Sequence, residues 1–101
     1  MKLMISLFKI QGGFIMHDTF LLNKISNSLK EICEKSRIKT IEQFNLVVNH
    51  NSHINEKNLL EHLSIHNRDI IADELKIEIQ RKDIPEQTAI ISSIKGETFE
   101  Q

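Results

Sequence analysis

The stretch Glu74–Gln80 (ELKIEIQ) alternates strictly between polar and apolar side chains. Successive side chains of a β-strand point to opposite faces of a sheet, so this pattern predicts a strand with one buried face and one exposed face. The apolar face carries Leu75, Ile77 and Ile79. One apolar face must pack against another layer, and the rest of the chain has to supply both that layer and the neighbouring strands.

Two other stretches also predict strands. Ile41–Asn49 (IEQFNLVVN) has a period of two, and Thr88–Ile94 (TAIISSI) is rich in β-formers. Arg81–Gln87 contains the only proline and predicts a turn. We expect Thr88–Ile94 to fold back antiparallel on Glu74–Gln80 as a hairpin. The apolar face of the earliest strand consists of Phe44, Leu46 and Val48.

Two stretches predict amphipathic helices. From Asp18 to about Ser36, apolar residues recur every three or four positions, and Cys33 is among them. We therefore expect Cys33 to be a small core residue and not a nucleophile or a ligand. The second helix is expected from Glu56 to about Asn67, with Asn55 as its N-cap. Its expected buried residues are Leu59, Leu60 and Leu63.

These elements occur in the order α-β-α-β-β. The predicted fold class is α+β, with two helices packed on one face of a three-stranded mixed sheet. The length of 101 residues suits one domain with a single modest core.

Met1–Ile15 (MKLMISLFKIQGGFI) admits three interpretations. Its apolar run resembles a secretion signal, but no small-x-small cleavage site follows and the run is too short to span a bilayer. Alternation of Leu3, Ile5 and Leu7 fits a strand in an extension that joins a sheet edge. In the third interpretation Met16 is the true start, because codons for Gln11-Gly12-Gly13 can contain a bacterial ribosome-binding sequence and Met16 follows at a normal initiation distance. Residues 1–15 are therefore an N-terminal extension or a mis-assigned start.

Composition limits the partners. The formal net charge is -1, so the chain lacks the basic field on which nucleic-acid binding relies, and we expect no nucleic-acid or membrane partner. With a single cysteine, the chain can form neither an internal disulfide nor a CxxC zinc site. We expect a cytoplasmic protein.

Four histidines form two pairs. His62 and His66 have the i, i+4 spacing that can chelate a transition metal on a helix, and they are the weaker alternative metal site. The HExxH pattern of metalloproteases is absent. His50 and His53 flank a polar turn without a third ligand in register. No arrangement of nucleophile and base can be nominated, so we expect no enzyme.

From Met16 onward, the chain resembles the HypA/HybF family of nickel metallochaperones. Members start with Met-His-Glu and a long amphipathic helix, and here Met16-His17-Asp18 precedes one. The Leu46-Val47-Val48 strand, the later helix and the Leu75–Ile79 strand follow in the family's order. The family then inserts a zinc module with paired CxxC motifs, which this chain lacks. The resemblance thus implies that residues 16–101 are a HypA-like nickel-binding domain without the zinc insertion.

The resemblance implies a nickel site at Met16, His17 and Asp18. Ni²⁺ favours tetragonal nitrogen ligands, which a free amine on Met16, the next main-chain nitrogen and the His17 imidazole would supply. If the mature chain begins at Met1, Met16 lacks that amine and His17 is a lone imidazole. Asp18 stands where the family usually has Glu, which keeps the carboxylate but shortens it.

The expected function is that of a nickel-binding accessory protein for the maturation of NiFe hydrogenase or urease. Ni²⁺ would be cargo and not a catalytic cofactor, and no zinc is expected. The resemblance implies a maturation GTPase or a target metalloenzyme as partner, and an exposed sheet edge allows a homodimer. The alternative is a degenerate HypA-like protein-interaction module that no longer binds metal.

Overall fold

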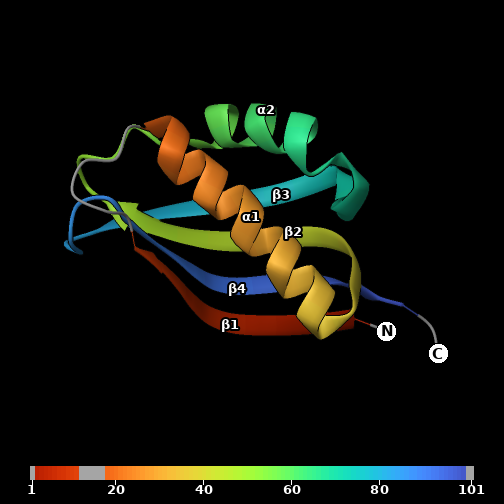
Figure 1. Cartoon of the computed structure of the whole chain (residues 1–101). Coiled ribbons are helices and arrows are strands. Elements are labelled where there is room, and N and C mark those ends of the chain that lie inside the picture. The colour runs from red at the N-terminus through yellow and green to blue at the C-terminus, as the bar shows by residue number, and fades with distance from the viewer. Residues whose placement is uncertain (1, 12–17, 100–101) are drawn as a thin grey trace.

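The computed structural model of the chain describes residues 2–11 and 18–99, and the side chains of residues 19–99. A four-stranded sheet carries the helices on one face (Figure 1). Within the described residues the elements are β1 (Lys2–Gln11), α1 (Asp18–Ser36), β2 (Ile38–Asn49), α2 (Glu56–His66), the 3-10 helix η1 (Arg68–Ile70), β3 (Ile71–Lys82) and β4 (Thr88–Thr98).

The predicted fold class is confirmed. From α1 onward the order is α-β-α-β-β, β2, β3 and β4 form a mixed sheet, and α1 and α2 lie over the same face of it (Figure 1). Asn55 is the N-cap of α2, as expected, and its side chain accepts a hydrogen bond from the Asn58 backbone N–H at 2.8 Å. All three predicted strands are longer than their sequence patterns indicated, because polar residues at the strand ends still join the hydrogen-bonded ladder.

The expected hairpin between Glu74–Gln80 and Thr88–Ile94 is wrong. The strand order is β1-β4-β2-β3: β4 pairs antiparallel with both β1 and β2, and β3 pairs parallel with β2. The α2 crossover connects the parallel pair, as such strands require. Burial explains the placement, because β4 buries Ala89, Ile91 and Ile94 and is central, whereas alternating β3 lies at an edge with polar side chains exposed.

The N-terminal segment adds a strand to the three that the sequence predicted. β1 pairs with β4 from Lys2↔Glu97 to Gln11↔Thr88. The strand that the alternation of Leu3, Ile5 and Leu7 predicted in this segment is present at the edge of the sheet.

The core lies between the helices and the covered face of the sheet. Cys33 on α1 is 4% exposed and belongs to this core, as predicted. The predicted inward face of β2 is confirmed, since Phe44, Leu46 and Val48 are fully buried in it. Leu60, expected to be buried, is 42% exposed, because the apolar stripe of α2 that faces the sheet is narrow and consists of Leu59 and Leu63.

Gly96 allows β4 to pass close to β2. A Cβ at this position would overlap the Thr40 carbonyl oxygen and would lie 3.2 Å from the Ile41 Cα. The pairing of β2 with β4 is irregular between Ile38 and Thr40 and between Ile41 and Gln43. Glycine is therefore required here by close backbone approach.

None of the helices in the described part of the chain is long and apolar enough to cross a membrane.

Candidate functional site

A small polar cavity opens at one end of the sheet. Its volume is about 160 Å³, and it lies where α1 begins, β2 ends and the β3–β4 turn returns. Figure 1 shows these three parts of the chain gathered at the same end of the molecule. The cavity is lined by Leu21, Asn49, Asn51, Ser52, His53, Glu86 and Gln87.

Asn49, the last residue of β2, joins the two loops around the cavity. Its side-chain nitrogen donates to the Ile84 carbonyl oxygen at 2.5 Å, and its side-chain oxygen accepts from the Asn51 N–H at 2.8 Å. The second bond is an Asx-turn, which reverses the chain directly after the strand. Asn49 is 9% exposed, so these bonds satisfy a nearly buried amide.

Arg81 of β3 fixes the other side of the β2–α2 loop. Its guanidinium donates to the Ser52 carbonyl oxygen at 2.7 Å and to the Ile54 carbonyl oxygen at 2.6 Å. A planar guanidinium suits two acceptors at fixed separation, so the backbone from Ser52 to Ile54 is held against the sheet.

The first turn of α2 anchors the same loop. Asn55 and Asn58 form a reciprocal capping box, and the Asn58 side chain also donates to the His53 carbonyl oxygen at 2.8 Å. Ile54 and Leu59 are fully buried on either side of this cap. The backbone on which His53 is carried is therefore well ordered by local bonds.

The side chains that line the cavity are mostly hydrogen-bonding groups. His53 and Glu86 are its titratable side chains, and amides, a hydroxyl and Leu21 form the rest of the lining. Among the residues whose structure is described, no group of three or more His, Cys, Asp or Glu side chains is placed to hold a metal ion.

Of the three predicted metal residues, one lies within the part of the chain that the structure describes. Met16 and His17 lie outside the described residues, and Asp18 is described through its backbone as the first residue of α1. Leu21, in the first turn of that helix, lines the cavity. The structure thus places the start of α1 beside the cavity and the two loops.

The alternative metal residues lie together on α2. The ring centroids of His62 and His66 are 4.3 Å apart and their planes are tilted by 38°. The pKa of His62 is lowered by burial, then by the nearby charges of His66 and Lys30. Neither lines the cavity, whose histidine is His53, since His62 and His66 occupy the second half of α2.

Neither Asn49 nor Arg81 was predicted as a determinant of the site. An asparagine at the end of an apolar strand, two residues before Asn51, is a recognisable Asx-turn signal. Nothing in the local sequence indicates the Arg81 bonds, because they join positions 27 and 29 residues apart.

Comparison of this chain with protein families, with characterised proteins and with solved structures finds no match.

Proposed function

We propose that the protein is a cytoplasmic nickel-binding accessory protein that serves the maturation of NiFe hydrogenase or urease. Its metal residues are Met16, His17 and Asp18, and it hands Ni²⁺ to a maturation GTPase or to the target metalloenzyme. The ion is cargo, so the site has to be labile and close to a surface that a partner can reach.

The observation that carries this proposal is the position of the first turn of α1. Leu21 lines the cavity with Ser52 and Glu86, and α1 begins at Asp18. Asp18, one of the proposed metal residues, thus begins the helix whose first turn meets the two polar loops. Function concentrates on such loops because they can contact a partner without disturbing the core.

The element order gives further support. The order α-β-α-β-β is the succession of elements that the family resemblance quoted. The described loops are tied down by Asn49 and Arg81, and a rigid setting favours reproducible docking.

The proposed site depends on a free amine at Met16. Two chains are therefore compared, one starting at Met1 and the other at Met16, by nickel calorimetry and by absorption of the metal complex. The chain starting at Met16 is expected to bind one Ni²⁺, whereas the chain starting at Met1 binds more weakly because only the imidazole remains. Circular dichroism shows whether the shorter chain, which lacks β1, is folded.

His17→Ala is the decisive variant, and His50→Ala is its matched control in an exposed turn. His17→Ala is expected to remove nickel binding from the chain that starts at Met16, and His50→Ala to leave it unchanged. Nickel binding no tighter than that of His17→Ala would overturn the proposal. Asp18→Glu tests the shortened carboxylate, because it restores the length that the family usually has.

The second candidate is a metal-free protein-interaction module. It is favoured by the edge position of β3, whose far side is unpaired by any other described strand. A homodimer through this edge would make the molecular mass in solution depend on protein concentration. Analytical ultracentrifugation with and without Ni²⁺ distinguishes the candidates, since the module would associate equally well without metal.

A further inference from the structure

A pair of imidazoles lies in the second half of α2, and neither residue lines the polar cavity. His62 and His66 are four positions apart, and their ring centroids are separated by 4.3 Å. Metal–nitrogen bonds of about 2.0 Å place two imidazoles at adjacent coordination positions roughly 4 to 5 Å apart, centre to centre. The two rings are thus already spaced as ligands of one ion would be.

His62 has a nitrogen atom without a partner. Its Nε2 is buried and makes no hydrogen bond within the described part of the chain. An unpaired buried polar atom is costly, and proteins seldom leave one without a reason. A metal ion would give this nitrogen a partner that the surrounding side chains do not supply.

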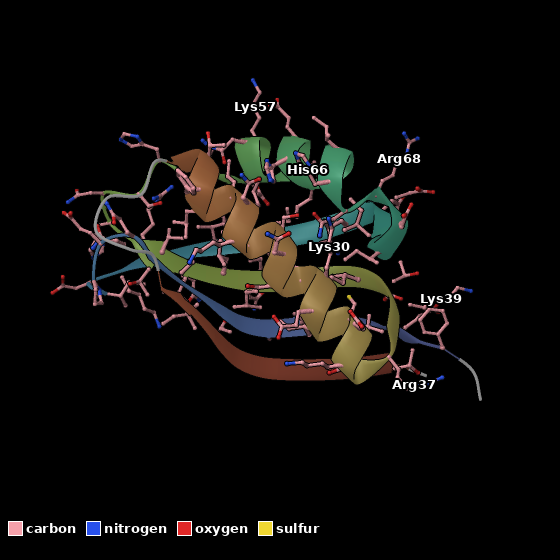
Figure 2. The ribbon with its side chains drawn as sticks, in the orientation of Figure 1. Lys30, Arg37, Lys39, Lys57, His66 and Arg68 are labelled. Atoms are coloured by element: carbon pink, nitrogen blue, oxygen red, sulfur yellow. The ribbon has the colours of Figure 1, made fainter. Side chains whose placement is uncertain are left out.

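The surroundings keep His62 ready to coordinate. No described side chain competes with an ion for the His62 Nε2, because that atom makes no hydrogen bond. His66 is exposed and can adjust its ring, and Figure 2 shows it on α2 with Lys30 on the adjacent α1.

The backbone beneath the pair is fixed. Asn67, which follows His66, is hydrogen-bonded to Ser26 of α1, and its N–H donates to the Leu63 carbonyl oxygen at 2.8 Å. Helical spacing and this anchor hold the two imidazoles in register without a bound ion. Ion binding then has to order the exposed His66 side chain but not the backbone beneath it.

We propose that His62 and His66 form a two-histidine site for a late first-row divalent metal ion, in which the exposed His66 ring turns to admit the ion to the buried His62 Nε2 and water fills the remaining coordination positions. Nitrogen ligands of this kind suit Cu²⁺, Ni²⁺ and Zn²⁺, and Cu²⁺ binds tightest in the usual order of affinities. The site is independent of the proposed nickel residues. Lys30 opposes the charge of the ion and weakens its binding.

The test uses the full 101-residue chain carrying His17→Ala, titrated with CuCl₂. Electron paramagnetic resonance is expected to show one Cu²⁺ bound by two imidazole nitrogens. The melting temperature is expected to rise with Cu²⁺, because an ion that binds only the folded chain stabilises it. His62→Asn and His66→Asn should each weaken binding by at least about tenfold and abolish this rise.

The controls separate this site from the other histidines. The double variant His62→Asn/His66→Asn should bind most weakly, because it lacks both imidazoles, whereas each single variant keeps one. His50→Asn and His53→Asn should leave binding unchanged, and Lys30→Gln should strengthen it because a repelling charge is removed.

A measurement on the chain with both α2 histidines intact does not depend on whether the α2 variants fold. Paramagnetic Cu²⁺ at low occupancy should broaden the ring-proton NMR signals of His62 and His66 before those of His50 and His53. Equal broadening of all histidines, or unchanged Cu²⁺ affinity in folded His66→Asn, would overturn the proposal. Because every chain carries His17→Ala, failure here leaves the proposed function untouched.

Discussion

Ser26 and Asn67 are hydrogen-bonded to each other across 41 residues of sequence. The Ser26 hydroxyl donates to the Asn67 side-chain oxygen, and the Asn67 side-chain nitrogen donates to the Ser26 carbonyl oxygen at 2.9 Å. Each residue is only 2% exposed. The pair joins the middle of α1 to the end of α2, where apolar contacts alone would allow the helices to slide.

Loss of one partner should therefore be costly. Asn67→Ala leaves the buried Ser26 hydroxyl unpaired, and we expect the free energy of unfolding to fall by about 1 to 3 kcal/mol. The double variant Ser26→Ala/Asn67→Ala should lose less stability than the sum of the losses in the two single variants. The difference, which is the coupling energy of the pair, should be roughly 0.5 kcal/mol or more. Urea denaturation measures all four chains. If the losses of the two single variants added up to the loss of the double variant, the pairing would be contradicted. Asn27→Ala, at the exposed neighbouring position, serves as the control.

The Ser26–Asn67 pair also shows which parts of the fold local sequence can predict. Periodicity located α1 and α2 well, since a helix with one apolar stripe depends on residues three and four apart. It could not establish that Asn67 meets Ser26, because that contact depends on how the helices cross. For the same reason the sequence placed β4 beside β3 and not between β1 and β2.

The candidate sites were likewise predictable from the sequence only in part. His62 and His66 were identified from their helical spacing, and the structure finds their rings 4.3 Å apart. The cavity was not predicted, because Asn49, Arg81 and Glu86 come together only through the parallel pairing of β2 with β3 and the return of the chain into β4. The Met16–His17 site remains a prediction.

Gly96→Ala should destabilise the sheet strongly. The added methyl group would overlap the Thr40 carbonyl oxygen, and a main-chain atom in a paired strand cannot move aside as a flexible side chain can. We expect a loss of about 2 to 3 kcal/mol in the free energy of unfolding, at the upper end for overpacking. Lys95→Ala, at the exposed neighbouring position, should change it by no more than about 0.5 kcal/mol. Equal denaturation midpoints for the two variants would contradict this account.

Cys33 should be unreactive in the folded protein. Burial raises the pKa of its thiol to about 11, so almost no thiolate is present at neutral pH. We expect dithionitrobenzoate to modify Cys33 slowly in buffer and rapidly in concentrated urea. Fast modification in buffer, under conditions where circular dichroism shows a folded chain, would refute the core assignment.

Arg81 should control the shape of the loop at the cavity. Arg81→Ala leaves the Ser52 and Ile54 carbonyl oxygens without their donor, and because water can reach this side of the loop we expect only about 0.5 to 1.5 kcal/mol of lost stability. Faster hydrogen exchange should be confined to residues 50–55. Arg81→Lys should restore only part of the protection, because an ammonium group cannot hold two acceptors in one plane. Lys82→Ala, which alters the exposed neighbour, is the matched control, and an equal effect of Lys82→Ala would argue against the bonds.

His62 should make stability sensitive to acid. Burial, His66 on the same helix and Lys30 on α1 place its pKa in the folded chain below the ordinary value of about 6.5 that it has when unfolded. Between these two pKa values the unfolded chain binds more protons, so the free energy of unfolding falls as the pH drops below about 6.5. His62→Asn should flatten this part of the profile, whereas exposed His50→Asn should leave its slope unchanged. Urea midpoints measured between pH 7.5 and 5 compare the chains. An identical slope in wild type and His62→Asn would show that another group is responsible for the acid sensitivity.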